Sequence, residues 1–233
     1  MYINTIYPGF MGEVNAYGIG APCVFLRLSG CNLRCYKKVL GTFCDTPEAL
    51  VPRSGTEMTD AEVILKILSY KRDLVCITGG EPLLQDIVPL VRDLTAQHNI
   101  KVVIETNGSL EIPSGLLHNY NINFVVDYKT SSAGVGKMCE QNWNKLSSRD
   151  FIKFVIYNED DFKEFVAWYR NCRGLAKVAV GLFWGGKKKY MQLMLQLEAL
   201  GITNVYLNVQ AHKLEMLYDN TEDVSKIFIP KNL

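Results

Sequence analysis

Short apolar runs, each followed by a polar segment, recur along this 233-residue chain. The first run covers residues 23–28 and stops at Ser29 and Gly30, and the next covers 74–77 and is followed closely by Gly79 and Gly80. Such runs are typical of strands that are buried on both faces of a sheet. We therefore predict strands at 23–28, 74–77, 101–104, 124–126, 152–156, 178–180 and 205–207.

Segments with helical spacing lie between several of these runs. Thr59 stands at a cap position with Glu62 three residues later, and the apolar residues Val63, Ile64 and Ile67 follow. This combination predicts the first turns of a helix. Apolar spacing also predicts helices over about 85–97, 160–169 and 190–200.

The alternation of strand and helix favours an α/β fold in which helices cover a parallel sheet. Six or seven such units fit an incomplete (β/α)6-type TIM barrel or an open sheet, because a closed barrel of eight units takes about 250 residues. No repeat or low-complexity linker divides the chain, so we expect residues 1–233 to form a single domain. Folds of this class bind ligands at the C-terminal ends of their strands, which is where the polar segments fall.

Composition and charge exclude several classes of protein. Hydrophobic residues make up 48% of the chain, which is enough for a sizeable core. The net charge is +1 and no apolar run approaches the roughly 20 residues that span a bilayer, so neither nucleic acid nor membrane is an expected partner. The N-terminus lacks the features of a signal peptide, and seven cysteines in such a chain indicate a reducing compartment. We expect a cytoplasmic protein.

Three cysteines, Cys31, Cys35 and Cys44, crowd into the loop after the first predicted strand. Three thiolates from one loop suit three corners of a cubane iron–sulfur cluster and leave one iron open to a small molecule. A zinc site is an alternative, although structural zinc normally takes four protein ligands. Buried cysteines with no shared role are the other alternative.

The residues around these cysteines resemble the radical S-adenosylmethionine (SAM) superfamily. Residues 27–35 lead into the loop in the manner of that superfamily, Phe43 stands before the third cysteine, and 79–82 form a GGEP motif at the next strand end. The resemblance implies a [4Fe–4S] cluster on Cys31, Cys35 and Cys44, with SAM on the open iron. It also implies that an electron from the cluster cleaves SAM and that the resulting 5′-deoxyadenosyl radical abstracts a hydrogen from the substrate.

Further motifs resemble the 7-carboxy-7-deazaguanine synthase family within that superfamily. They are Gly12-Glu13, Gly20-Ala21-Pro22, Cys44-Asp45-Thr46 and Gln210-Ala211-His212. The family converts 6-carboxy-5,6,7,8-tetrahydropterin to 7-carboxy-7-deazaguanine with loss of ammonia, a carbon–nitrogen lyase step in queuosine-type 7-deazapurine biosynthesis. The resemblance implies Mg²⁺ as a further cofactor, an electron donor such as flavodoxin, a small-molecule pterin substrate and a homodimer.

The resemblance also implies roles for individual residues. Thr46 would ligate Mg²⁺, which prefers oxygen ligands, with Asp45 as a neighbouring partner. Glu13 and Arg27 would face the pterin, because a carboxylate suits its amide and amine edge and a guanidinium suits its carboxylate. The implied SAM-binding residues are Phe43, Gly79, Gly80, Glu81, Glu105, Asp127, Tyr128, Lys129 and Lys153. The implied substrate-binding residues are Phe10, Met11, Gly12, Glu13, Arg27, Thr78, Gln210 and His212.

Several of these assignments have alternatives. Arg27 also fits a surface position, Lys153 a snorkelling side chain at a strand end, and His212 a structural role. Asp45 also fits a turn or helix cap. A small glycyl-radical activating enzyme is the alternative within the superfamily, and a non-catalytic zinc-binding adaptor is the alternative outside it.

Two features depart from the family pattern. Eight residues separate Cys35 from Cys44 where two are usual, which predicts an expanded cluster-binding loop over about 31–58. Within the insertion, Lys37 and Lys38 are either a docking surface for an acidic electron donor or simply solvated. At 127–129 the sequence Asp-Tyr-Lys replaces Ser-Pro-Lys, so only Lys129 matches.

Overall fold

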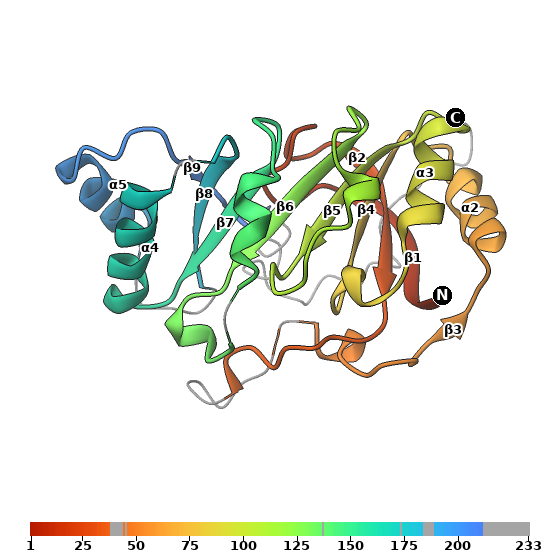
Figure 1. Ribbon diagram of the computed structural model, residues 1–233, viewed down its shortest axis with the longest axis horizontal. Helices are drawn as coiled ribbons and strands as arrows, with labels where there is room; N and C mark the ends of the chain where they lie inside the picture. Colours follow the sequence, from red (N-terminus) through yellow and green to blue (C-terminus); the bar gives the residue numbers. More distant parts are fainter. Residues whose placement is uncertain (38–43, 45, 137, 173, 184–188, 212–233) are drawn as a thin grey trace, which may run out of the picture.

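A computed structural model describes residues 1–37, 44, 46–136, 138–172, 174–183 and 189–211 of the chain (Figure 1). Within these residues, nine strands form one open sheet in the order β3-β1-β2-β4-β5-β6-β7-β8-β9, which runs from right to left in Figure 1. Strands from β2 to β9 along this order are parallel, and β1 and β3 extend the β2 edge in antiparallel pairing. The predicted incomplete barrel is confirmed, because the two edge strands do not meet.

The strands agree closely with the apolar runs of the sequence. Their bounds are β1 (Tyr2–Phe10), β2 (Pro22–Leu28), β3 (Thr56–Glu57), β4 (Leu74–Gly79), β5 (Lys101–Thr106), β6 (Ile122–Tyr128), β7 (Phe151–Ile156), β8 (Lys177–Leu182) and β9 (Tyr206–Leu207). The sequence did not predict β1 or β3. In β1 the exposed residues interrupt the apolar ones, because this strand lies close to the edge of the sheet.

In the part of the chain that the structure describes, four α-helices lie on the outer face of the sheet (Figure 1). They are α2 (Asp60–Ser69), α3 (Val88–Ala96), α4 (Glu159–Asn171) and α5 (Tyr190–Ala199), and short 3-10 turns cover 47–49, 82–84, 114–116, 131–133 and 140–144. The predicted capping box is present at α2, where the Thr59 hydroxyl accepts the Glu62 N–H and the Glu62 carboxylate accepts the Thr59 N–H. No helix in the described ranges combines the length and the apolar character needed to cross a membrane.

The helix predicted from residue 85 begins three residues later than expected. Gln85 instead binds two strand ends, since its side chain accepts the Tyr2 N–H at 2.8 Å and donates to the carbonyl oxygens of Tyr2 at 3.0 Å and Ser29 at 3.1 Å. These contacts hold residue 85 in extended backbone, and α3 starts after them.

Both faces of the parallel strands are buried, which explains their continuous apolar character. On the outer face, Val75 and Ile77 of β4 pack with side chains of the helices in the main core. On the inner face, Cys76 of β4 and Phe151 of β7 belong to a second cluster. Met11 and Val14 complete this second cluster, so the segment 11–21 that follows β1 covers the inner face.

Two buried asparagines fasten the segment 11–21 inside the sheet. Asn208 Oδ1 accepts the Val14 N–H at 2.9 Å, and Asn123 Oδ1 accepts the Ala16 N–H at 2.9 Å. Both asparagines are fully buried. The side chain of Glu13 is thereby held against the inner face of the sheet.

Candidate active site

The inner face of the sheet changes from apolar to polar toward the C-terminal ends of the strands. Because side chains alternate along a strand, the residues two positions after the inner apolar ones also point inward. The successive inner pairs are Cys76 and Thr78 on β4, Val103 and Glu105 on β5, Val125 and Asp127 on β6, and Phe151 and Lys153 on β7. The expected rim of polar residues is therefore present, with charges on three neighbouring strands.

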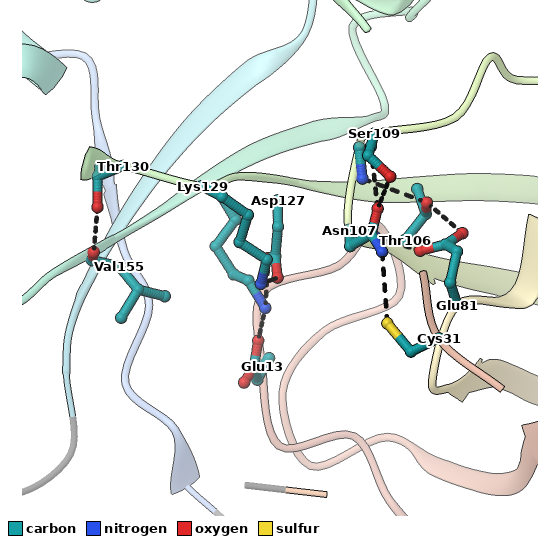
Figure 2. Close-up of polar contacts among 12 residues, drawn as sticks. Glu13, Cys31, Glu81, Thr106, Asn107, Ser109, Asp127, Lys129, Thr130 and Val155 are labelled. Carbon is teal, nitrogen blue, oxygen red and sulfur yellow. Dashed lines mark hydrogen bonds and ion pairs between the residues drawn. The ribbon is translucent and has the colours of Figure 1, made fainter. Parts of the chain in front are cut away.

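Four charged side chains form a line of alternating sign across this rim. Lys153 Nζ donates to Glu13 Oε2 and lies 3.0 Å from Asp127 Oδ1, and Lys129 Nζ donates to Asp127 Oδ2. Figure 2 shows Glu13, Asp127 and Lys129 pointing toward one another. The other Glu13 oxygen, Oε1, accepts from Gln210 Nε2 at 2.8 Å. The structure thus brings together residues that the sequence assigned to substrate and to SAM.

Burial and pairing act in opposite directions on these ionisable groups. Burial disfavours the charged form of Asp127, but the Lys129 and Lys153 ammonium groups outweigh it and hold the pKa of Asp127 below its usual value. The pKa of Glu13 is lowered in the same way, because Lys153 outweighs its burial. The carboxylates in turn raise the pKa of Lys153 far above its usual value, despite burial. All three groups therefore stay ionised at neutral pH.

Glu105 has the opposite electrostatic environment. Burial raises its pKa, and the negative charge of Glu13 adds to this effect. Lys153 and a hydrogen bond from the Thr78 hydroxyl counteract the rise only in part. Glu105 is therefore easier to protonate than Glu13 or Asp127, whose pKa values are lowered.

The cysteine loop begins beside this line of charges. Gly30, with a φ of +98°, turns the chain after β2, and Cys31 follows it. Cys31 Sγ accepts the Leu33 N–H at 3.4 Å. It also accepts an Asn107 Nδ2–H at 3.7 Å, as Figure 2 shows. Cys35 is buried close to Cys31 and to Lys129, whose positive charge partly offsets the rise that burial causes in the pKa of the Cys35 thiol. Cys44, at the far end of the loop, is half-buried.

The donor set at these cysteines fits an iron–sulfur cluster. Thiolates are the ligands of such clusters, and N–H groups directed at the sulfurs are among the features that set their potentials. Cys31 receives two N–H groups of this kind. Among the described residues, no group of three His, Cys, Asp or Glu side chains is arranged to hold a single metal ion.

The GGEP segment packs its backbone against the start of the cysteine loop. A Cβ on Gly80 would lie 2.1 Å from the Gly30 carbonyl oxygen and 2.6 Å from that of Ala49. The Glu81 N–H donates to the same Gly30 oxygen at 2.8 Å. The Glu81 carboxylate is buried and accepts from the Thr106 hydroxyl and from the N–H groups of Asn107 and Leu83 (Figure 2). This carboxylate thus joins the ends of β4 and β5 and has protein partners on both oxygens.

Arg27 and Thr46 also lie together. Arg27 Nη1 donates to Thr46 Oγ1 at 3.4 Å, and Nη2 donates to the Tyr7 hydroxyl at 3.4 Å. Arg27 is on the inner face, level with Thr78 of the neighbouring strand. The two residues that the sequence assigned to the substrate carboxylate and to Mg²⁺ are therefore neighbours.

Some sequence-assigned residues lie elsewhere. Phe10 ends β1 opposite Pro22, at the N-terminal edge of the parallel strands, where its exposed ring contacts Arg72. The Tyr128 ring points to the outer face and stacks on Phe154 with ring centroids 4.5 Å apart, so its side chain is not on the inner face. Met11 is buried in the inner apolar cluster. Phe43, Asp45 and His212 lie outside the described residues.

Sequence reasoning missed several polar residues of the site. Asn208 directly follows a predicted strand and donates through Nδ2 to Glu13 Oε2 at 3.3 Å. Asn107, Asn32 and Ser109 form a hydrogen-bonded group beside Cys31. The one local signal was their position at a strand end or next to Cys31, at the edge of the sheet where α/β folds bind their ligands.

Comparisons with known proteins agree with this geometry. Residues 26–128 match the model of the radical SAM superfamily. The structure of QueE from Escherichia coli superposes with a TM-score of 0.67 at 22% identity, covering 90% of this chain and 93% of that one. A 7-carboxy-7-deazaguanine synthase from Koribacter versatilis is 35% identical over 182 residues, which are 75% of this chain and 73% of the relative. The chain belongs to the 7-carboxy-7-deazaguanine synthase family.

A second member of this family comes from Methanospirillum hungatei. It is 37% identical over 171 residues, which are 70% of this chain and 64% of that relative. Membership of the radical SAM superfamily implies a [4Fe–4S] cluster and SAM as cofactors of this chain. The inner face of the sheet and the cysteine loop are therefore parts of a radical SAM enzyme.

Proposed function

We propose that this chain converts 6-carboxy-5,6,7,8-tetrahydropterin to 7-carboxy-7-deazaguanine with loss of ammonia. The observation that carries the proposal is the line Glu13–Lys153–Asp127–Lys129. It joins the residues that would bind the pterin to those that would bind SAM, and its last member lies next to Cys35. Both ligands would then meet on one buried polar surface.

The residues at the cysteine end would hold the cofactors. Cys31, Cys35 and Cys44 would ligate the [4Fe–4S] cluster. Lys129 would lie beside the cluster, where its ammonium group would bind the carboxylate of SAM. When bound, the cluster and SAM supply a carbon radical that takes a hydrogen atom from the substrate. The backbone of Gly79 and Gly80 would position the start of the cysteine loop, because it contacts Leu28 at the end of β2 and Gly30 directly.

The residues at the other end would orient the pterin. Glu13 would accept hydrogen bonds from the amide and amine edge of the pterin. Gln210, which donates to Glu13 Oε1, would be displaced by the pterin or would keep its hydrogen bond beside it. Arg27 would bind the substrate carboxylate, and Thr46, 3.4 Å from Arg27, would ligate Mg²⁺ next to the same carboxylate. A buried surface of this kind also excludes water from the reacting atoms.

The remaining parts of the proposal concern the whole protein. Residues 1–233 would act as a single domain with an expanded cluster-binding loop, and two chains would form a homodimer. A small acidic electron donor such as flavodoxin would reduce the cluster. We place the enzyme in the cytoplasm, where its cysteines, among them Cys31 and Cys35, would not be oxidised to disulfides.

Turnover by the reconstituted enzyme tests this function. The protein is loaded anaerobically with iron and sulfide and then incubated with SAM, Mg²⁺, a reductant and 6-carboxy-5,6,7,8-tetrahydropterin. We expect a deazapurine absorbance to grow together with released ammonia, and neither signal from a variant with Cys31, Cys35 and Cys44 replaced by Ala. An enzyme that carries a full cluster, leaves the pterin unchanged and instead generates a glycyl radical on a partner protein would overturn the proposal.

A further inference from the structure

Asn208 is a fully buried polar residue that directly follows the last strand of the sheet. Its side-chain oxygen accepts the Val14 N–H at 2.9 Å, and its side-chain nitrogen donates to Glu13 Oε2 at 3.3 Å. One amide therefore contacts both the backbone and the carboxylate of the segment that covers the inner face.

We propose that Asn208 is a positioning residue that determines which oxygen of Glu13 faces the substrate. The inference rests on the proposed function, because it takes Glu13 as the carboxylate that meets the pterin. Lys153 and Asn208 both donate to Oε2. Among the described residues, Oε1 accepts only the hydrogen bond from Gln210. Oε1 is thus the oxygen whose partner the substrate can replace.

The surroundings of Asn208 hold it rigidly in this position. Its backbone N–H donates to the Val180 carbonyl oxygen at 2.8 Å, and its own carbonyl oxygen accepts the Tyr190 hydroxyl at 2.8 Å. Gly181 allows this close approach, because a Cβ there would lie 2.8 Å from the Asn208 carbonyl oxygen. Strand β8 and helix α5 therefore support Asn208 from behind, and Asn208 in turn supports Glu13.

A purely structural role is the competing explanation, since Asn208 also fastens the segment 11–21. Asn123 provides a matched control for that role. It is equally buried and accepts the Ala16 N–H of the same segment at 2.9 Å, but its other hydrogen bonds go to Arg149, Asp150 and the Phe124 carbonyl rather than to Glu13. The two asparagines thus share the fastening contact and differ in the contact with Glu13.

Kinetics of three variants separate the two explanations. We expect Asn208→Ala to raise KM for the pterin about tenfold, because a hydrogen bond to a charged group is lost, while kcat falls less and SAM affinity is unchanged. Asn208→Asp, which keeps the size but places a second carboxylate beside Glu13, should raise KM further. Asn123→Ala should lower Tm as much as Asn208→Ala and leave KM within about twofold. Equal KM changes in Asn208→Ala and Asn123→Ala, or none in either, would overturn the inference.

A second measurement needs no turnover. Among the described residues, the titratable groups that face Glu13 are Lys153, Asp127, Glu105, Cys76 and Tyr190, and Gln210 donates to it. With these unchanged, loss of the Asn208 donor should raise the pKa of Glu13, measured by carbon-13 NMR of its carboxyl group and assigned with Glu13→Gln. An unchanged titration in Asn208→Ala would contradict the positioning role. If the wild-type protein shows no pterin turnover, the proposed function fails, and this titration still decides whether Asn208 acts on Glu13.

Discussion

Lys153 is the positively charged partner of two buried carboxylates on the inner face. It contacts Glu13 and Asp127, and its side chain is 9% exposed. Breaking a buried pair by removing one partner leaves charge that neither water nor protein compensates. The stability of this region therefore depends on keeping Lys153 and its two carboxylates together.

The first prediction concerns removal of that lysine. Lys153→Met should lower the free energy of unfolding by about 3–5 kcal/mol, as measured by urea denaturation of the cluster-free protein. The control is Lys163→Met on α4, whose pair with Asp160 lies 3.1 Å apart with side chains 70% and 82% exposed. That change should cost less than about 1 kcal/mol. Similar losses in the two variants would contradict the assignment of Lys153 as a buried counter-charge.

The second prediction concerns the pH dependence that Glu105 confers. Its pKa is raised in the folded protein, so the stability that it contributes is complete below the unfolded pKa, near 4.5, and is lost as pH rises through the folded value. Glu105→Gln resembles the protonated form of Glu105, so position 105 in this variant loses no stability as pH rises. The variant should match the wild type below pH 4.5 and unfold at a higher urea concentration near pH 8. If the difference in unfolding urea concentration between the variant and the wild type were largest at low pH, the pKa of Glu105 would be lowered and not raised.

Single residues also show what the sequence could and could not predict. Glu13, Lys153 and Asp127 were all identified from the resemblance, but their mutual contact was not. Glu13 and Gln210 are separated by 197 positions, and a contact at that distance leaves no local pattern. The orientation of Tyr128 was also hidden, because strands that are apolar on both faces do not reveal which side is the inner one.

At the scale of elements, the junction between β2 and β4 determines where the cysteine loop starts. Gly79, the last residue of β4, and Gly80 lie so close to Leu28 and Gly30 at the end of β2 that neither has room for a side chain. The GGEP segment therefore has a structural reason for its glycines in addition to any contact with a ligand.

The third prediction concerns that junction. Gly80→Ala places a Cβ 2.1 Å from the Gly30 oxygen, so the backbone that leads into Cys31 must move. We expect the iron content per chain to fall several-fold after anaerobic reconstitution. Gly136→Ala is the control, since a Cβ at Gly136 meets nothing within 4 Å. Full iron loading of Gly80→Ala would show that the junction does not position the loop.

The elements themselves were predictable where burial imposes a pattern. The capping box at Thr59 correctly predicted the start of α2, and the apolar runs predicted β2 and β4 through β9 with starts that differ from the observed ones by two residues at most. Strand β1 was missed because its pattern of exposed and buried residues, with Pro8 and Gly9 near its end, is not that of a core strand. Helix α3 starts late because Gln85 is engaged by Tyr2 and Ser29, two residues distant in sequence.

At the scale of the whole molecule, an open sheet places charge from several strands on one buried surface. The segment 11–21 enters this surface from the β1 edge, and residues 208–211 reach it from the β9 edge, where the Ala211 N–H donates to the Gly12 carbonyl oxygen at 2.9 Å. Both ends of the sheet thus contribute to the position of Glu13. The unclosed barrel was predictable from the number of units, whereas this meeting of its two edges was not.

An anaerobic crystal structure with SAM and 6-carboxy-5,6,7,8-tetrahydropterin tests the proposed site most directly. The pterin ring should lie on the inner face within hydrogen-bonding distance of Glu13 Oε1, with its carboxylate at Arg27 and SAM between it and the cluster on Cys31, Cys35 and Cys44. A pterin bound away from Glu13, or a cluster held by other residues, would contradict it.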